Sequence, residues 1–360
     1  MKNITIFKRL ATAFITLIAA VMMMAGTAVQ AQTKTATYAM YGDIKDWDPA
    51  SAFSLEVMML VNVYEPLLWY NAPGSKEQFS PALATDWSVS EDGLSWTFNL
   101  RENVKFHDGE PFNAAAAKTA LERTMELKKG AYYIWSSVES IEASGNTLVI
   151  KTKTPQPIDL IASSQYGAYI YSPKAAASGA DWFNQGNAAG TGPYTVRQWD
   201  KAQQVVLEKN ADYWGGWTEG QFDRVILKVV TENSTQLQML KAGEADFISL
   251  VPADMVDSVN QEKGLTAYAI PSWKNSQFLI NTKKAPTDNK KFRQALTHIW
   301  DYDTVVNEIY AGYADVGRGP IPASMWGHDS SIQAPAFDLQ MAKQLLEESG
   351  VPKSEWKVSI

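Results

Sequence analysis

The sequence contains no cysteine among its 360 residues, which excludes disulfide bridges, thiolate metal sites and a lipid anchor on cysteine. Histidine is scarce, and His107, His298 and His328 lie too far apart for the ligand spacing of a zinc site. No G-x-S-x-G, H-E-x-x-H or G-x-x-x-x-G-K-[ST] motif occurs. We therefore find no catalytic constellation for an enzyme, and we expect no metal and no cofactor.

Basic residues are fewer than acidic ones, 32 against 39, so the net charge is −7. Residues 1–31 hold three basic residues and no acidic one, so the remainder of the chain carries −10. An acidic surface repels the phosphate backbone of nucleic acids, and we expect no nucleic-acid partner. The charge does not identify the ligand.

One apolar run stands near the N-terminus, from Leu10 to about Met24. It is shorter than the ~20 apolar residues that a membrane span needs. Three basic residues precede it, and the small residues of Val29–Ala31 follow it, which is the order of a secretory signal peptide. The sequence predicts that residues 1–31 are a signal peptide cleaved near Ala31 and that the protein is periplasmic. An uncleaved membrane anchor is the alternative.

The most informative stretch is residues 81–112. Apolar residues alternate with polar ones on both sides of Asp92-Gly93, which predicts a β-hairpin. The alternating residues are Trp87, Val89, Trp96, Phe98 and Leu100. A shorter strand is predicted at 104–106, followed by Asn113 as the N-cap of a helix over 114–129 that ends at Gly130.

The rest of the chain alternates between strand and helix patterns, which is typical of an α/β protein. Strands are predicted at 36–41, within 140–153, after residue 194, at 224–230, at 245–250 and in the last residues from Trp356 to Ile360. Helices are predicted at 54–64, at 235–242 with Gly243 as its stop, from an N-cap at Asp288, and at 338–348 with Met341 facing inward.

These motifs resemble the peptide/nickel family (family 5) of extracytoplasmic solute-binding proteins, the receptors that hand ligands to ABC importers. The resemblance rests on consecutive segments: S-x-D-G, W-T-F-x-L-R and V-K-F-H-D-G-x-P-F within residues 90–112, G-T-G-P-Y at 190–194, and N-A-D-Y-W-G at 210–215. One departure is Ala115-Ala116, where the family often has Asp-Val. The resemblance covers nearly all of residues 36–360.

The resemblance implies an α/β, periplasmic-binding-protein-like two-lobed fold (type II, cluster C). It implies residues 32–68 as the first part of lobe I, 69–195 as an inserted sheet-rich subdomain, 196–280 as the second part of lobe I, and 281–360 as the N-terminal fragment of lobe II. Because family chains usually continue further, we expect this chain to be C-terminally incomplete, with lobe II truncated.

Candidate ligand-binding residues come from aromatic and polar positions in predicted loops, since ligand sites are usually apolar clefts with a few polar groups. The sequence has 13 Trp and 15 Tyr, most of which belong to the core by their spacing. The residues that we predict to line the ligand site are Phe53, Ser54, Tyr169, Trp273 and Trp326.

The ligand class follows from a comparison of motifs within the family. Nickel-chelate binders place an Arg in the loop that here is 165–173, which has none, and a Tyr and a Met where this chain has Ala52 and Val57. Dipeptide binders carry a segment similar to I-P-x-x-M-W-G at 321–327. The acidic group that pairs with a peptide's amino terminus lies, in those members, beyond Ile360.

Two classes of function remain. The first is a monomeric periplasmic receptor that takes up a short peptide and delivers it to the membrane permease of an ABC importer, without catalysis. An oligosaccharide, an opine or a nickel chelate is the alternative ligand. The second and less favoured class is a secreted polymer hydrolase whose aromatic residues bind sugar.

Overall fold

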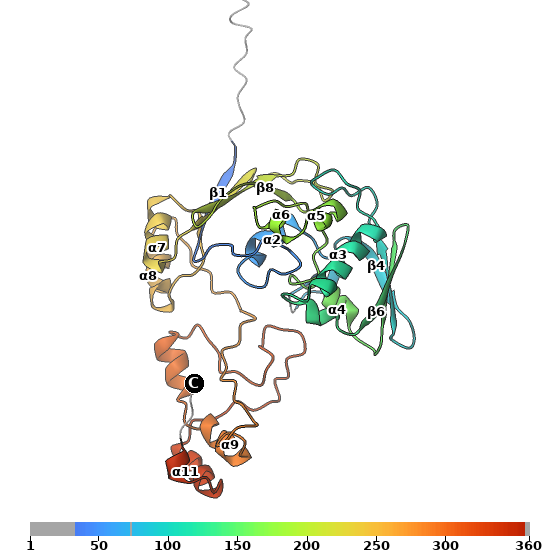
Figure 1. Cartoon of the computed structure of the whole chain (residues 1–360). Coiled ribbons are helices and arrows are strands. Elements are labelled where there is room, and N and C mark those ends of the chain that lie inside the picture. Colours follow the sequence, from blue (N-terminus) through green and yellow to red (C-terminus); the bar gives the residue numbers. More distant parts are fainter. Residues whose placement is uncertain (1–32, 73, 357–360) are drawn as a thin grey trace, which may run out of the picture.

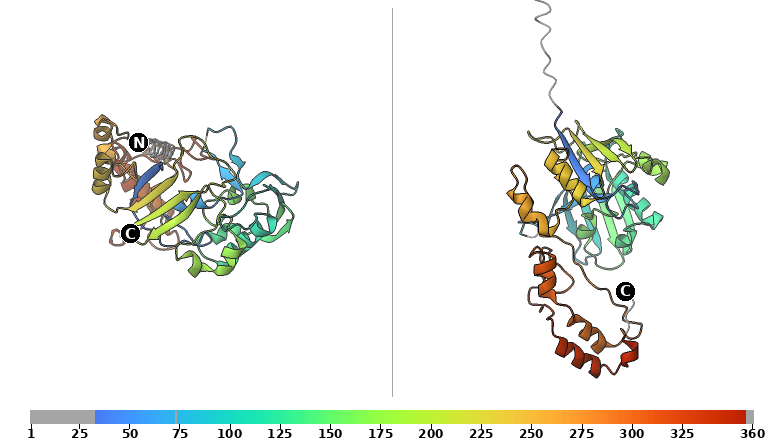
Figure 2. Two further views of the ribbon diagram at one scale, coloured as in Figure 1. Left: turned by 90° about the horizontal axis from the view of Figure 1, so that it is seen from above. Right: turned by 90° about the vertical axis from the view of Figure 1, so that its left-hand side faces the viewer.

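The computed structural model describes residues 33–72 and 74–356. The predicted signal peptide lies outside these residues, as does most of the strand predicted at the C-terminal end; Trp356 itself follows a 3-10 turn, η4 (Lys353–Glu355). Figure 1 shows a larger part with all the sheets and a smaller part that carries α9 and α11, and Figure 2 shows the same separation from another side.

The larger part contains a five-stranded sheet in the order β11-β1-β10-β9-β8. The central strands β1 (Thr35–Met40) and β10 (Arg224–Val229) are parallel, and β1 also pairs in parallel with the short β11 (Phe247–Ile248). Antiparallel pairing adds β9 (Gln204–Lys209) and then β8 (Tyr194–Asp200). Parallel strands need a crossover connection, and α7 (Asn233–Ala242) supplies it between β10 and β11.

A second, four-stranded antiparallel sheet has the order β4-β5-β7-β6. The predicted hairpin is confirmed, because β4 (Ala84–Val89) pairs with β5 (Ser95–Leu100) around Asp92-Gly93. The strands β7 (Thr147–Thr152) and β6 (Val138–Ser144) complete the sheet. Figure 1 shows α3 lying along this sheet.

The helix α3 (Ala114–Leu127) begins where the sequence predicts. The side chain of Asn113 accepts a hydrogen bond from the backbone N–H of Ala116 at 3.0 Å, which is the N-cap arrangement. The helix ends two residues earlier than predicted, because Lys128 takes the left-handed conformation with φ 51°.

Other predicted elements also differ from the structure. The strand at 104–106 is reduced to one bridge between Lys105 and Pro111, because a tight turn joins the two segments. The helix predicted at 54–64 is the shorter α2 (Val57–Val63). The helix α9 (Lys290–Thr297) is capped by Asn289 rather than Asp288, since Asn289 accepts the N–H of Phe292 at 3.1 Å.

The last helix, α11 (Leu339–Glu348), has its predicted cap, because Asp338 accepts the N–H of Met341 at 2.9 Å. Met341 does not face inward as predicted; it is 40% exposed, whereas Ala342 is buried. In the described residues from 264 to 356 there is no β-strand, and large apolar side chains such as Tyr268 and Leu279 are more than three-quarters exposed.

The remaining elements are short. They are β2 (Leu68–Tyr70), β3 (Phe79–Pro81), η1 (Tyr132–Trp135), α4 (Ile158–Ala162), α5 (Pro173–Ser178), α6 (Ala180–Phe183), η2 (Ala253–Met255), α8 (Val256–Gln261), α10 (Tyr302–Thr304) and η3 (Val305–Ile309). One continuous core joins both sheets and α2, and it includes the fully buried rings of Trp47, Tyr64, Phe98, Trp135 and Phe183.

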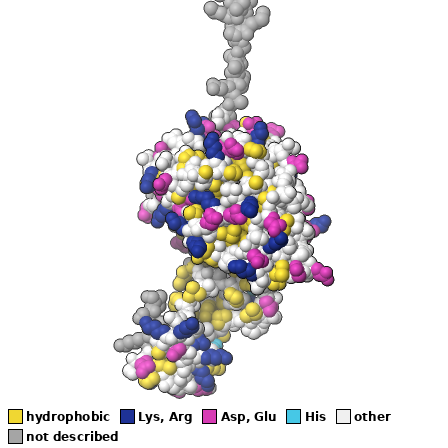
Figure 3. Space-filling view, turned by 45° about the vertical axis from the view of Figure 1, so that its right-hand side comes forward, with side chains coloured by type: hydrophobic (Ala, Val, Ile, Leu, Met, Phe, Trp, Pro, Cys, Tyr) yellow, Lys and Arg dark blue, Asp and Glu magenta, His cyan; other side chains and the backbone are white. Residues whose placement is uncertain are grey.

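Figure 3 shows how the surface differs along the molecule. Hydrophobic side chains gather on the neck between the larger and the smaller part, and Lys and Arg gather on the smaller part below it. Among the described residues, no helix is long and apolar enough to cross a bilayer.

Candidate functional site

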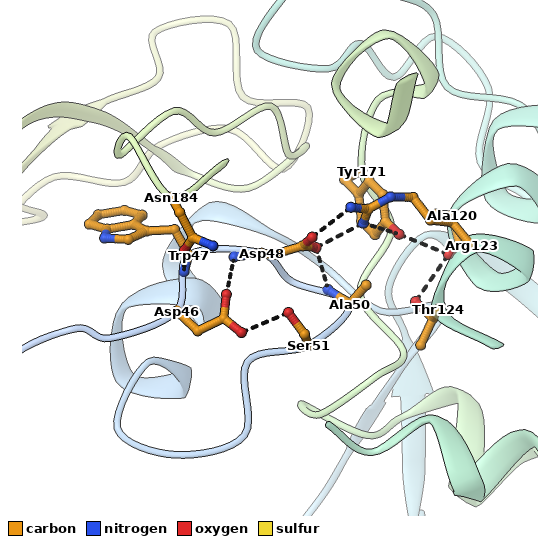
Figure 4. Close-up of polar contacts among 10 residues, drawn as sticks. All are labelled: Asp46, Trp47, Asp48, Ala50, Ser51, Ala120, Arg123, Thr124, Tyr171 and Asn184. Carbon is orange, nitrogen blue, oxygen red and sulfur yellow. Dashed lines mark hydrogen bonds and ion pairs between the residues drawn. The ribbon is translucent and has the colours of Figure 1, made fainter. Parts of the chain in front are cut away.

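The loop between β1 and α2 is held in place by a buried ion pair (Figure 4). The guanidinium of Arg123, on α3, bonds to both carboxylate oxygens of Asp48 at 2.5 and 2.8 Å. Asp48 is fully buried and also accepts the backbone N–H of Ala50. Because the two partners lie 75 residues apart, this pair joins the loop to the second sheet's helix.

Aromatic rings enclose this ion pair. The guanidinium of Arg123 lies 5.5 Å from the ring centre of Tyr171 and 5.2 Å from that of Phe183. Arg123 also donates to the Tyr171 hydroxyl, which donates in turn to the backbone oxygen of Ala120. Burial acts to lower the pKa of Arg123, but its bonds to Asp48 and Tyr171 outweigh this and raise it, so Arg123 stays charged.

Two of the predicted ligand residues, Phe53 and Ser54, lie in the same loop. Together with Tyr166, which follows α4 in the sequence, we call them the Phe53 cluster. The rings of Phe53 and Tyr166 meet edge to face at 5.3 Å, and the Tyr166 hydroxyl donates to the backbone oxygen of Ser54 at 3.3 Å. Phe53 is 54% exposed and Ser54 is exposed, so both are accessible to a ligand.

Tyr169 differs from the other candidates, because the structure buries it at 1% exposure. The segment that carries it pairs with the chain after α2, since the N–H of Ile170 donates to the backbone oxygen of Glu65. This pairing turns Tyr169 toward the core, where its ring lies 5.9 Å from that of Tyr64. Its predicted contact with a ligand stays a prediction, and in this conformation it presents no surface to solvent.

The second group, which we call the Trp273 cluster, contains Trp273, Trp326, Tyr70 and Asn71. Trp273 meets the ring of Tyr70 edge to face at 5.3 Å, and the indole N–H of Trp326 donates to the backbone oxygen of Asn71 at 3.0 Å. Both tryptophans therefore lie against the end of β2, although more than 200 residues separate them from it in the sequence. The structure thus places four of the five candidates in two groups, and Tyr169 lies apart from both in the core.

Sequence reasoning missed a buried carboxylate, Glu65, directly after α2. One of its oxygens accepts from Thr191 and from the indole of Trp214, each at 2.7 Å, and the other accepts from the Tyr213 hydroxyl at 2.9 Å. Burial raises the pKa of Glu65, although these hydrogen bonds act to lower it. Thr191 belongs to the motif G-T-G-P-Y, and Tyr213 and Trp214 belong to N-A-D-Y-W-G. The sequence showed both motifs, but it did not show that Glu65 is their common hydrogen-bond partner.

We expect the free energy of unfolding to reveal this pKa. Because folding raises the pKa of Glu65 above its ordinary value of 4.5, the folded state keeps a proton at pH values where the unfolded state has lost it. The stability that this proton contributes is fully present below pH 4.5 and is lost as the pH rises through the raised pKa. Urea titrations at several pH values in this range measure the free energy of unfolding. As the pH rises, this free energy should fall more steeply for the wild type than for Glu65→Gln.

Thr191→Val is the matched control for this measurement. It removes one donor to the carboxylate of Glu65, and that hydrogen bond acts to lower the pKa. The pKa should then rise further and the decline should extend to higher pH than in the wild type. Parallel pH profiles for the wild type and Glu65→Gln would contradict the assignment.

His107 and the acidic side chains were also considered as candidates for a site. Nε2 of His107 lies 2.9 Å from the backbone oxygen of Gly192, and burial lowers its pKa, so this histidine has a structural place beside G-T-G-P-Y. Within residues 33–72 and 74–356, no group of three or more His, Asp or Glu side chains is arranged to hold a metal ion.

Comparison with known proteins identifies the family. The sequence profile of the bacterial extracellular solute-binding proteins, family 5 Middle, matches residues 78–358, which is more than half of the chain. The chain belongs to family 5 of the bacterial extracellular solute-binding proteins. The resemblance inferred from the motifs at 90–112, 190–194 and 210–215 is thereby confirmed.

Two curated relatives and one solved structure show what this family 5 protein is similar to. It is 32% identical over 287 residues to the probable D,D-dipeptide-binding periplasmic protein DdpA of Escherichia coli K12, covering 78% of this chain and 55% of that protein. It is 31% identical over 277 residues to the glutathione-binding protein GsiB of Pectobacterium atrosepticum, covering 75% of this chain and 52% of that protein. The chain spans about half the length of these relatives.

The structural comparison agrees with the family. The periplasmic binding protein DppA from Helicobacter pylori, solved in complex with the peptide STSA, superimposes with a TM-score of 0.74 at 27% identity. The match covers 90% of this chain and 68% of that one. The predicted α/β, periplasmic-binding-protein-like fold is confirmed by this match.

Proposed function

We propose that this protein is the periplasmic receptor of an ABC importer and that it binds a short peptide without chemical change. The observation that carries the proposal is family 5 membership together with relatives named for binding a dipeptide and glutathione, and a similar structure that holds a peptide. The Phe53 and Trp273 clusters support it, because Phe53 and Trp273 each offer exposed aromatic surface.

The domain boundaries belong to the same proposal. Lobe I consists of residues 32–68 and 196–280, with residues 69–195 inserted, and residues 281–360 belong to lobe II. The four-stranded sheet falls within the inserted range, and the five-stranded sheet is built from the two flanking ranges apart from Tyr194 and Thr195 of β8. Closure of the two lobes over an extended peptide would bury its backbone hydrogen-bonding groups. The receptor acts as a monomer with the membrane permease as its partner.

Isothermal titration calorimetry on the protein purified from its native host tests the function, because it measures the affinity for each ligand. The panel contains di- to pentapeptides, oligosaccharides, opines and nickel chelates, and product analysis accompanies each titration. We expect binding of peptides and no turnover. Tight binding of a sugar, an opine or a chelate with no response to peptides would replace the ligand class, and turnover would exclude the receptor function.

Export should remove the N-terminus after about Ala31, because the small residues there follow an apolar run too short to anchor the chain. Mass spectrometry of the protein recovered from the periplasm checks this expectation. A mass that includes Met1 would exclude cleavage.

We expect Phe53→Ala and Trp273→Ala each to weaken peptide binding by about 5- to 30-fold, which corresponds to the ~1–2 kcal/mol typical of exposed aromatic anchors. Phe247→Ala is the matched control, because Phe247 is 52% exposed, as Phe53 is 54% exposed, but lies on the edge strand β11. Calorimetry measures all three. Equal affinities in the three variants would exclude the two clusters from the ligand site.

A further inference from the structure

Hydrogen bonds join two distant segments of the chain beside the neck. The segment 272–275 connects the larger part to the smaller one, and the segment 319–326 belongs to the smaller part. The side-chain amide of Asn275 donates to the backbone oxygen of Pro320 at 3.3 Å, and the hydroxyl of Ser324 donates to a backbone oxygen of the first segment. The tryptophans that the two segments carry are therefore held in one unit.

The backbone oxygen of Asn71, at the end of β2, is held in place by the hydrogen bonds of its own residue. The N–H of Asn71 donates to the backbone oxygen of Gln78 at 2.8 Å. Its side-chain amide donates to the backbone oxygen of Glu77 at 3.0 Å, and its side-chain oxygen accepts the hydroxyl of Ser80 at 2.9 Å. The indole N–H of Trp326 donates to this fixed backbone oxygen at 3.0 Å, across 255 residues.

A row of aromatic rings continues the same contact into the four-stranded sheet. The ring of Trp273 meets that of Tyr70 edge to face at 5.3 Å. Tyr70 meets Phe79 on β3 at 5.8 Å, and Phe79 meets Trp87 on β4 at 6.4 Å, both edge to face. Such pairs are favourable beyond the apolar area that they bury. Movement of the smaller part away from β2 would break the Trp273–Tyr70 contact and the Trp326 hydrogen bond together.

We propose that these two contacts form a latch between the lobes, in which Trp326 is a positioning residue that holds lobe II against the inserted subdomain before a ligand binds. This inference rests on the proposed function. The apparent dissociation constant is the intrinsic one divided by the fraction of molecules in the binding-competent arrangement. Because the latch raises that fraction, it strengthens ligand binding without contacting the ligand.

The arrangement of the lobes can be measured because the chain has no cysteine, so spin labels react only at introduced ones. Glu91→Cys, in the turn between β4 and β5, and Lys343→Cys, on α11, place exposed labels on the inserted subdomain and on lobe II. Pulsed electron paramagnetic resonance gives the distance distribution between the labels in the ligand-free protein. We expect one main distance when the latch is intact.

Trp326→Phe keeps an aromatic ring but removes the N–H donor. In the labelled, ligand-free protein it should raise the population at a second distance, relative to the first, by about 2- to 10-fold, which is the effect of one hydrogen bond. Tyr70→Leu is the second latch variant, because it removes the ring that Trp273 contacts but keeps an apolar side chain. It should raise the same population.

Trp217→Phe is the matched control, because the indole N–H of Trp217 also donates to a backbone oxygen, that of Asn210 at 2.8 Å, but within lobe I. Its label distances should equal those of the wild type. Isothermal titration calorimetry with peptides should show binding to Trp326→Phe and Tyr70→Leu weakened by about 2- to 10-fold. A saturating peptide should restore the main distance in both variants.

Unchanged distances in ligand-free Trp326→Phe and Tyr70→Leu would exclude the latch. If Trp326→Phe loses affinity without a change of distance, Trp326 contacts the ligand and the latch is wrong. An equal shift in Trp217→Phe would also exclude it, because the effect would not depend on a contact between the lobes. If the wild type binds no peptide, the proposed function fails, whereas the distances in the ligand-free protein still decide whether the latch exists.

Discussion

Asp48→Asn is expected to lower the free energy of unfolding by about 3–5 kcal/mol, because it leaves the Arg123 guanidinium buried without its counter-charge. The Arg123 side chain is 13% exposed and that of Asp48 is 0% exposed, so solvent cannot replace the lost carboxylate. The rings of Tyr171 and Phe183 that lie beside Arg123 do not supply a hydrogen-bond acceptor for both of its nitrogens. Urea titration at constant pH measures the change.

The matched control is Glu142→Gln in the ion pair with Lys151, whose side chains are 58% and 45% exposed. Water and salt screen such surface pairs, and their loss costs about 0–1 kcal/mol. Similar losses of stability in Asp48→Asn and Glu142→Gln would show that the buried pair does not anchor the loop after β1.

Gly190→Ala is the second change with a large expected effect. A Cβ atom on Gly190 would lie 1.9 Å from the backbone oxygen of Val63 and 2.7 Å from its carbonyl carbon, which is far inside van der Waals contact. The backbone on both sides must move, because neither neighbour is a flexible side chain. We expect a loss of more than about 3 kcal/mol in the free energy of unfolding, at or above the upper end of overpacking effects.

Gly317→Ala serves as the control for this substitution. A Cβ atom on Gly317 would meet only Oδ1 of Asn275, at 3.7 Å, which is an ordinary contact. The free energy of unfolding of Gly317→Ala should stay within about 0.5 kcal/mol of the wild-type value in the same urea titration. A tolerated Gly190→Ala would mean that the loop of G-T-G-P-Y does not lie against the end of α2.

The elements that could be predicted from the sequence are those whose signals are local. Asp92-Gly93 between alternating residues predicts a hairpin, and Asn113 and Asp338 predict helix starts, because a turn or a cap is made by residues a few positions apart. The prediction of Asp288 as a cap was wrong, because the adjacent Asn289, a residue of similar capping strength, accepts the N–H of Phe292 instead.

Local sequence patterns predict the candidate site only in part. Aromatic residues in predicted loops led to Phe53 and Trp273, which are exposed, and their contact with a ligand stays a prediction. The same composition also selected Tyr169, which a backbone pairing with the segment after α2 turns into the core. The position of Glu65 as the common hydrogen-bond partner of two separate motifs has no signature in the sequence at all.

By itself, the sequence determined the family and the α/β class of the fold, because contiguous motifs such as those at 90–112 depend only on residue order. Only the tertiary structure decided which buried charges are paired. Arg123 reaches Asp48 across 75 residues, and Thr191, Tyr213 and Trp214 reach Glu65 across 126 to 149 residues. These contacts exist because burial in the common core removes water from each carboxylate, and donors brought by distant segments replace that water.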